Sequence, residues 1–285
     1  MNKEYNENYY RTNMGCGEDY SNREYWGPRF REIAECIIKE FNPKSFIDVG
    51  CAYGYLVEAL RDLGVEAYGL DVSEYAISQS REDIREFLYV ADIVNGIPEV
   101  LRRKYDCAST IEVIEHIKDD YTDAFLDIFC SLSDVLIFSS SPSDIIEKTH
   151  VNVQQPEYWC KRFAQRGFFR NLNANSLLLS QDEMIFIKEE KNCKTLVEDY
   201  EHHLRLIKET EIKKRDEWLE LKINDIKHLE EEIKLREDHI KLLEDEIKQK
   251  DRAILELNQE KKKFWDEIQN IKNSKLFRYT KFLRM

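Results

Sequence analysis

Acidic residues stand at the ends of three short apolar runs in the first third of this 285-residue chain. Asp48 lies in the first run, Asp71 ends the second and Asp92 follows the third. The first run leads into a turn of small residues at 50–54, whose glycines allow a tight bend and a close approach to a ligand. This turn lacks the Gly-Lys-Ser/Thr of a phosphate loop and the glycine spacing of a dinucleotide fingerprint. It therefore predicts a phosphate-free ligand, with Asp48 accepting hydrogen bonds from an ammonium group or from water.

The second and third acids suit the other parts of a nucleoside-like ligand. Asp71 stands 21 residues after Gly50, where a carboxylate can accept both hydroxyls of a ribose. Asp92 can accept from an exocyclic adenine amine beside the apolar Ile93. One such acid alone would more often be a solvated residue at a strand end, whereas three in succession favour a site. The predicted ligand-binding residues are Asp48, Gly50, Cys51, Ala52, Gly54, Asp71, Val72, Asp92, Ile93 and Glu112.

A second cluster combines carboxylates with imidazoles. Glu112, Glu115 and His116 would share one face of a helical turn, and His150 comes from a later loop at the same rim. Histidines with an ordinary pKa of about 6.5 can act as a general base. Together the four side chains could instead hold a divalent ion that orients a substrate hydroxyl. In a purely structural role, Glu115 or His116 would cap or pack the turn.

Short apolar runs alternate with amphipathic segments between residues 25 and 190. The runs lie at 45–50, 66–71, 87–91, 105–111, 134–139, 168–172 and 184–188. The helical segments lie at 25–41, 54–63, 74–86, 119–131 and 156–166. This alternation predicts an α/β fold with a doubly wound, mostly parallel sheet, on which ligands bind at the carboxyl ends of the strands.

The order of these motifs resembles the class I S-adenosylmethionine-dependent methyltransferases. The resemblance rests on Asp48-x-Gly50-x-x-x-Gly54, then Leu70-Asp71, Ala91-Asp92, Tyr105-Asp106 and Glu112-Val113-Ile114-Glu115-His116. It implies a Rossmann-like, seven-stranded sheet over residues 25–190 with S-adenosylmethionine as the cofactor. Asp48, Gly50 and Gly54 would then line the methionine end, Asp71 the ribose and Asp92 the adenine. Ala52 departs from the pattern, since many members have glycine there.

Further motifs are similar to those of small bacterial methyltransferases associated with cell-surface glycan synthesis. These are the Gly15-Cys16-Gly17 segment and the later Ser-Pro, His-Val-Asn and Glu-Tyr-Trp motifs. The resemblance implies O-methylation of a sugar hydroxyl in polysaccharide biosynthesis, with His116, His150 and Glu115 as catalytic residues. Glu-x-x-Glu-His with a later His is also similar to the magnesium-binding arrangement of some O-methyltransferases, which implies Mg²⁺ on Glu112, Glu115, His116 and His150.

Three other functions stay open at this point. One is small-molecule O-methylation of a quinone-like or secondary metabolite, and another is RNA 2′-O-methylation. The third is a scaffold without catalysis. Residues 1–190 carry 20 basic against 34 acidic residues, a net charge of −14, which disfavours a nucleic-acid partner. Seven cysteines without a Cys-x-x-Cys pair, and no visible signal peptide or membrane span, indicate a cytoplasmic protein.

The last 118 residues contain neither glycine nor proline. We expect a helical connector at 191–211 and a coiled coil at 212–271, about 90 Å long. Aliphatic residues occupy seven consecutive a positions of a heptad repeat: Ile212, Leu219, Ile226, Ile233, Ile240, Ile247 and Ile254. This pattern favours a homo-oligomer, with a parallel dimer preferred and a trimer open. A solitary helix held by i,i+4 ion pairs is the alternative.

The two ends of the chain carry aromatic side chains. Residues 1–24 are expected to form a lid or strap, in which Tyr9 and Tyr20, with Tyr25 and Trp26 just beyond it, either close over the acceptor or simply pack on the domain. Residues 272–285 contain five basic residues and no acid, interleaved with apolar side chains. This tail predicts docking to a partner or to the inner membrane surface, unless it is a frayed, solvated end.

Overall fold

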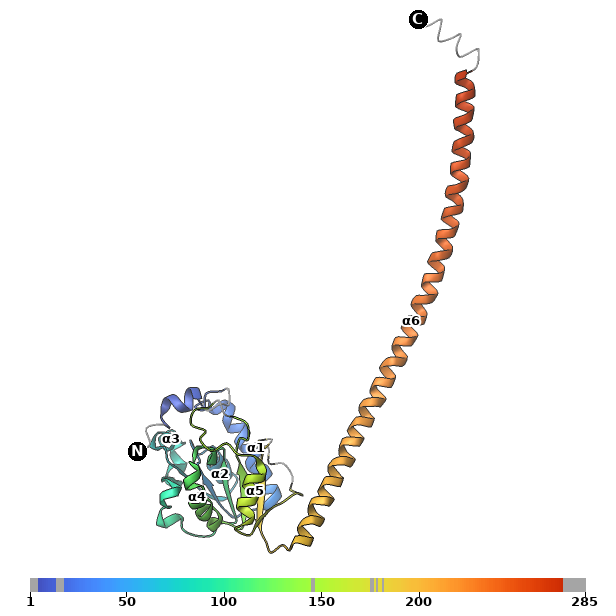
Figure 1. Cartoon of the computed structure of the whole chain (residues 1–285). Coiled ribbons are helices and arrows are strands. Elements are labelled where there is room, and N and C mark those ends of the chain that lie inside the picture. Colours follow the sequence, from blue (N-terminus) through green and yellow to red (C-terminus); the bar gives the residue numbers. More distant parts are fainter. Residues whose placement is uncertain are drawn as a thin grey trace. The chain divides into compact units, whose positions relative to one another are not determined.

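A computed structural model of the chain describes residues 5–13, 18–144, 147–174, 177, 179–180 and 182–273 (Figure 1). The chain divides into two units, residues 1–204 and 205–285. The first unit contains a sheet with flanking helices, and the described part of the second consists of one helix.

Seven strands form one sheet in the order β3-β2-β1-β4-β5-β7-β6. Their bounds are Ser45–Val49 (β1), Glu66–Asp71 (β2), Leu88–Val90 (β3), Cys107–Ile111 (β4), Val135–Ser139 (β5), Phe168–Arg170 (β6) and Met184–Lys188 (β7). Strands β1 to β5 pair in parallel, whereas β7 is antiparallel to both β5 and β6. The predicted doubly wound sheet is confirmed, and its order reverses between β1 and β4, which is where such sheets bind ligands.

Helices cover both faces of this sheet. Their bounds are Arg23–Phe41 (α1), Tyr55–Asp62 (α2), Glu74–Ser78 (α3), Asp119–Leu132 (α4) and Pro156–Ala164 (α5). The single helix expected over 74–86 was wrong: α3 ends at Ser78, and a separate short turn follows at Glu82–Phe87. The hydroxyls of Ser78 and Ser80 donate to the carbonyls of Tyr75 and Ile77, which competes with helix propagation.

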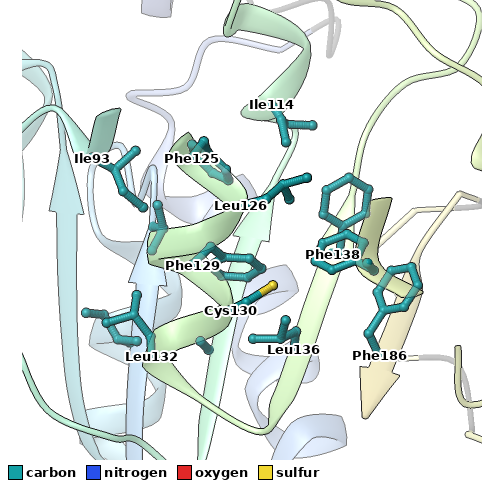
Figure 2. Packing of buried hydrophobic residues seen from close by; sticks show 14 of the residues in the cluster. Ile93, Ile114, Phe125, Leu126, Phe129, Cys130, Leu132, Leu136, Phe138 and Phe186 are labelled. Atoms are coloured by element: carbon teal, nitrogen blue, oxygen red, sulfur yellow. The ribbon is translucent and has the colours of Figure 1, made fainter. Parts of the chain in front are cut away.

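Successive side chains of each strand point to opposite faces of the sheet, so the core is divided into two layers. In β5, Leu136 and Phe138 face the side covered by α4 and α5, whereas Ile137 faces the side covered by α1 and α2. Figure 2 shows Phe125, Leu126 and Phe129 of α4 among the buried residues that pack with Phe138 of β5. Two buried apolar layers thus hold the strand ends in fixed positions around the site.

The last helix, α6, spans Cys193–Asn273 and includes both the predicted connector and the predicted coiled-coil segment. None of its 81 residues is buried within the chain. The predicted tail lies outside the described residues from position 274 onward. No helix in the described ranges is long and apolar enough to cross a membrane.

Truncation of the central aromatic side chain should destabilise the first unit. Phe138 is fully buried, with its ring centre 5.2 Å from that of Phe163 and 5.5 Å from that of Trp159. We expect Phe138→Ala to lower the free energy of unfolding by about 3–5 kcal/mol, because it removes buried area and leaves a cavity. Urea denaturation measures this loss. The control Val100→Ala, at a side chain that is 60% exposed, should change stability by less than about 0.5 kcal/mol.

Candidate active site

A cavity of about 1210 Å³ lies at the carboxyl ends of β1, β2, β3 and β4. Nine of the ten predicted ligand-binding residues line it: Asp48, Gly50, Cys51, Ala52, Asp71, Val72, Asp92, Ile93 and Glu112. Gly54 is not among the described lining residues. It has a positive φ of 74° and is the N-cap residue that precedes α2.

The turn after β1 is shaped by close contacts and positive φ angles. Gly50 has φ 83°, and a Cβ at this position would lie 2.3 Å from Cγ2 of Val113, so no side chain fits without displacing Val113. Ala52 has φ 46°, a conformation that costs a residue with a Cβ about 1–2 kcal/mol. Its amide donates to Oδ2 of Asp71 at 2.8 Å, and this bond offsets the strain. The alanine that departs from the glycine pattern is therefore held in a glycine-like conformation.

The carboxylate of Asp71 joins two turns at the edge of the cavity. Its Oδ2 accepts from the amide of Ala52, and its Oδ1 accepts from the amide of Ser73 at 2.7 Å. Burial raises the pKa of this carboxyl, and the backbone amides oppose that shift. The backbone amides of Ala52, Val72 and Ser73 thus favour its ionised form, in which the carboxylate can still accept from a ligand hydroxyl.

Asp48 lies almost fully buried at the end of β1. Its Oδ1 accepts from Oγ of Ser109 on β4 at 2.6 Å. Burial raises the pKa of this carboxyl to about 7, while the Ser109 hydroxyl acts in the opposite direction. A buried carboxyl with little compensating positive charge is suited to a cationic ligand group, which would favour its ionised form.

Asp92 combines a structural role with a place on the cavity wall. Its carboxylate accepts from the amide of Val94 at 3.1 Å and from Nδ2 of Asn95 at 2.8 Å, and so begins the short turn Ile93–Asn95. The neighbouring Ile93 is buried and lines the cavity, as an apolar wall for a flat ring would.

The second cluster differs from the predicted set. The ring centres of His116 and His150 are 4.7 Å apart, and Nε2 of His150 lies 3.6 Å from Oε2 of Glu147. Ligand atoms of these three residues lie within 4.8 Å of one another, which in the described part of the chain holds for no other group of three or more such residues. The predicted metal ligands Glu112 and Glu115 are thus replaced by Glu147. The sequence did contain a signal for this residue, because Glu147 and His150 are spaced i,i+3.

Glu112 and Glu115 separate because the chain does not form the helical turn expected there. Glu112 has a positive φ of 52° and lies before the short turn Ile114–His116, so the two side chains do not share a helix face. Glu112 lines the cavity, whereas Glu115 is fully buried and is not among the described residues that line it. Burial and the neighbouring Glu112 carboxylate raise the pKa of Glu115 above its ordinary value.

The catalytic role of Glu115 stays a prediction, and the contacts that this residue makes are with the later loop. Its Oε1 accepts from the amide of Ser141 at 3.2 Å. Its carbonyl accepts from the amides of Val151 at 2.8 Å and Asn152 at 2.9 Å. These bonds fasten the loop that carries His150 against the turn that carries His116.

His116 lines the cavity, whereas His150 lies behind it and is not among the lining residues in the described ranges. Nδ1 of His116 lies 3.3 Å from the carbonyl of Thr149, so this nitrogen carries the proton and Nε2 keeps its lone pair. Burial, and then the neighbouring His150, lower the pKa of His116 to about 4. The ordinary value expected from the sequence was wrong for this residue, which is neutral at physiological pH.

Aromatic residues of the N-terminal segment form another wall of the cavity. The rings of Tyr5 and Tyr9 lie edge-on to His116, with centres 5.8 Å and 6.3 Å away. The Tyr9 hydroxyl interacts with Thr149 and Glu147, and burial raises its pKa. Tyr20, Tyr25 and Trp26 also line the cavity.

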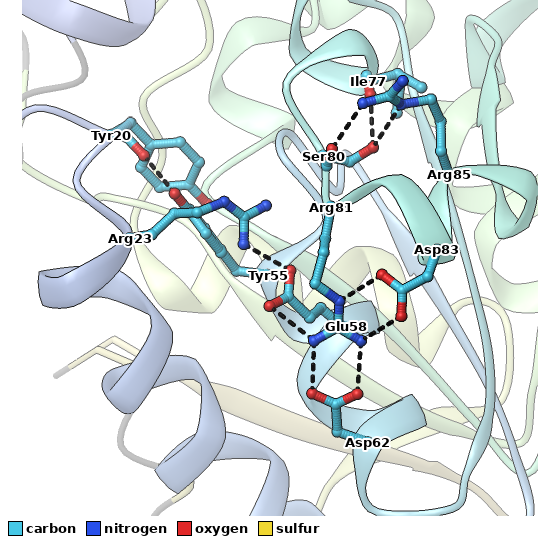
Figure 3. A network of polar contacts seen from close by, with 10 residues as sticks. All are labelled: Tyr20, Arg23, Tyr55, Glu58, Asp62, Ile77, Ser80, Arg81, Asp83 and Arg85. Atoms are coloured by element: carbon cyan, nitrogen blue, oxygen red, sulfur yellow. Dashed lines mark hydrogen bonds and ion pairs between the residues drawn. The ribbon is translucent and has the colours of Figure 1, made fainter.

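An ion-pair network fastens this segment to the sheet domain (Figure 3). Arg23 at the start of α1 pairs with Glu58 of α2 at 2.8 Å, and Arg81 pairs with Glu58 and with Asp62. The Tyr55 hydroxyl donates to the carbonyl of Tyr20 at 2.9 Å. The segment entering α1 is therefore tied to α2, whose first residue follows the small-residue turn of the cavity.

Comparison with known proteins places the sheet domain in a family. Residues 22–170, just over half of the chain, match the family described as "Methyltransferase domain". The ubiquinone biosynthesis O-methyltransferase of Pelagibacter ubique is 30% identical over 102 residues, which cover 32% of this chain and 42% of that protein. The protein of the same name from Methylococcus capsulatus is 31% identical over 80 residues, covering 27% and 34%. The chain thus spans under half the length of these relatives.

Solved structures of similar fold have low sequence identity. The magnesium protoporphyrin IX methyltransferase of Synechocystis PCC 6803 with bound SAH is 17% identical, with a TM-score of 0.46, over 60% of this chain and 87% of that one. The methyltransferase domain of a bacterial Hen1 protein is 21% identical, with a TM-score of 0.41, over 59% of this chain and all of that one.

The buried Asp48 carboxyl should make the stability of the ligand-free protein depend on pH. Its pKa is about 7 in the folded state and 3.8 ordinarily, so the folded state binds more protons between these values. This contribution stabilises the protein below about pH 4 and is lost as the pH rises to 7. We expect Asp48→Asn to remove a decline of about 2–4 kcal/mol, measured by urea denaturation from pH 4 to 8.

A second substitution tests the cause of this pH dependence. Ser109→Ala removes the hydrogen bond that stabilises the ionised Asp48, so the decline should become larger and extend to higher pH. Equal slopes in Asp48→Asn and the unmodified protein would show that Asp48 is not the titrating group.

Proposed function

Because the chain belongs to the methyltransferase domain family, we propose that it transfers the methyl group of S-adenosylmethionine to a hydroxyl of a small-molecule acceptor. Family membership agrees with the enzyme class and the cofactor expected from the sequence. The observation that carries the proposal is the acidic cavity, in which Asp48, Asp71, Asp92 and Glu112 lie at four neighbouring strand ends. This cavity would repel a phosphate-bearing cofactor and suits a ligand with ammonium and sulfonium charges.

The residues of the cavity fit the parts of this cofactor. Asp71 would accept from the ribose hydroxyls and Asp48 from the ammonium group. Asp92 and Ile93 offer a carboxylate and an apolar wall to the adenine, and Gly50 lets the turn after β1 pack directly against Val113. The bound cofactor supplies a methyl group activated by the sulfonium. The protein then has to orient the acceptor hydroxyl and take its proton.

We infer that His116 accepts that proton, as a neutral but weak base, because its pKa is lowered. Its Nδ1–H donates to the Thr149 carbonyl, which leaves the Nε2 lone pair available in a side chain that lines the cavity. Glu115 acts through its backbone carbonyl by holding the His150 loop against His116. The rings of Tyr5 and Tyr9 lie edge-on to His116 and enclose it further.

The relatives favour a small acceptor over a glycan. Both proteins named above are ubiquinone biosynthesis O-methyltransferases, so their names support methylation of an oxygen on a small molecule. The aromatic wall of Tyr5, Tyr25 and Trp26 provides surfaces on which a planar acceptor can stack. The sugar hydroxyl expected from the sequence has no support from these names. A screen of phenolic and sugar acceptors with labelled cofactor distinguishes the two classes.

Cofactor binding and methyl transfer should respond to different substitutions. We expect S-adenosylhomocysteine to bind the unmodified protein. Its affinity should fall at least about tenfold in Asp71→Ala, because this variant loses the proposed ribose contacts and the hydrogen bond to the Ala52 amide. His116→Ala should keep the affinity within about threefold and lower turnover at least about 100-fold. Calorimetry and a methyl-transfer assay measure these quantities. The absence of binding by the unmodified protein would favour the scaffold function.

Cation binding is a second candidate role for the same cluster, favoured by the spacing of His116, Glu147 and His150. Two imidazoles and one carboxylate suit Zn²⁺, Fe²⁺ or Mn²⁺ better than the Mg²⁺ expected from the sequence. A bound cation would orient the acceptor hydroxyl and would occupy the His116 nitrogen that otherwise accepts the proton.

Glu147→Gln distinguishes the two roles of His116. It removes a cation ligand and leaves His116 in place, so turnover should stay within about threefold of the unmodified protein if His116 acts as a base. Treatment with a chelator should also leave the rate unchanged. Loss of turnover in both experiments, with recovery on adding Zn²⁺ or Mn²⁺ to the unmodified protein alone, would instead assign the cluster to a cation.

A further inference from the structure

A 14-residue repeat runs through the second half of α6. Residues 226–239 read IKHLEEEIKLREDH, and residues 240–253 read IKLLEDEIKQKDRA. In each repeat Ile stands at positions 1 and 8, Leu at position 4, a base at position 11 and acids at positions 5 to 7. A third copy begins with Ile254 and Leu257. The repeat equals two heptads, so the positions with the same side-chain chemistry recur on one face of the helix.

The isoleucines of this repeat form an exposed apolar line that we call the isoleucine stripe: Ile226, Ile233, Ile240, Ile247 and Ile254. Their side chains are 53–58% exposed, and α6 buries no residue within the chain. Leu229, Leu243 and Leu257 flank the stripe and are also exposed. A continuous apolar line in water is typical of a surface that contacts another helix.

Two cations beside the stripe lack the ion pairs that neighbouring lysines make. Lys222, Lys241 and Lys248 lie 3.0, 3.7 and 3.2 Å from carboxylates of their own helix. In the described part of the chain, Arg236 and Lys250 have no carboxylate oxygen within 4.0 Å. Each of them replaces the leucine of the preceding heptad, so both stand at a core position of a helix pair.

Acidic residues border these two cations on the flanks of the stripe. Glu237 follows Arg236, and Asp251 follows Lys250. These acids occupy the e position of the heptad, which lies beside the core of a parallel pair. In such a pair each core side chain enters a hole formed by four residues of the facing helix, which includes this flanking position. The flanks alone would repel, because both helices present acids there. A cation inserted between them at every second heptad supplies the missing positive charge.

We propose that α6 pairs with α6 of a second copy of this chain, parallel and in register, and that Arg236 and Lys250 bind the partner's Glu237 and the partner's Asp251. The isoleucine stripe supplies the apolar contact of the pair. The two cations set its orientation and register, because a shift by one heptad places them opposite leucines. A second copy fits this surface because its own acids complement the cations.

Substitutions on and off the stripe test the pairing in the full chain. Ile233→Asp with Ile240→Asp places charges in the contact, so we expect the mass in sedimentation equilibrium to fall from two chains to one. The control, Leu235→Asp with Leu242→Asp, places the same charges two residues further along, outside the stripe, at side chains that are 71% and 66% exposed. It should keep the mass of two chains. A single-chain mass for the unmodified protein at about 10 μM, or equal behaviour of the two variants, would overturn the proposal.

Exchange of the charges tests the ion pairs. Arg236→Glu and Glu237→Arg should each raise the dissociation constant of the pair about tenfold, because each leaves like charges at the contact. The double variant restores opposite charges and should return to within about threefold of the unmodified protein. Additive losses in the double variant would show that Arg236 and Glu237 do not meet across the pair, and circular dichroism checks that all three variants remain helical.

Discussion

The carboxylate of Asp71 is the contact on which the geometry of the cavity depends. It accepts one amide hydrogen bond from the turn after β1 and one from the turn after β2. These bonds hold Ala52 at a positive φ and fix the start of α3, whose N-cap residue is Ser73. The cost of burying the carboxyl is offset by backbone donors. The same side chain lines the cavity, so its hydrogen bonds shape the surface of which it forms part.

The surroundings of His116 are built from segments far apart in the sequence. Tyr5 and Tyr9 come from the N-terminal segment, His116 follows β4, and His150 and Glu147 belong to the loop after β5. Two sets of interactions hold these segments together. The backbone bonds to Glu115 hold the later loop, and the ion pair of Arg23 with Glu58 holds the start of α1 on α2. His116 is neutral and partly enclosed because it is buried against His150 and two tyrosine rings, which come from separate segments.

Local patterns predicted the sheet well because its strands have one dominant signal, a short apolar run between turns. All seven strands lie within or close to the predicted runs, and the acids at their ends reach one cavity. The errors arose where a nonlocal or competing contact decides the structure. Ser78 and Ser80 hydroxyls end α3 early, and the positive φ of Glu112 breaks the expected helical turn. Glu147 was missed because only the folded loop brings it to His116.

The distribution of turn residues explains why the two parts of the chain bury their apolar side chains in different ways. The sheet domain contains all of the glycines and prolines, so it can reverse direction and bury two apolar layers inside itself. Helix α6 has no residue that reverses the chain, and at 1.5 Å per residue its 81 residues extend about 120 Å. A helix of this length cannot fold back to cover its own apolar line. In the proposed pair, the isoleucines leave water against a second copy of α6, and the charges beside them select that partner.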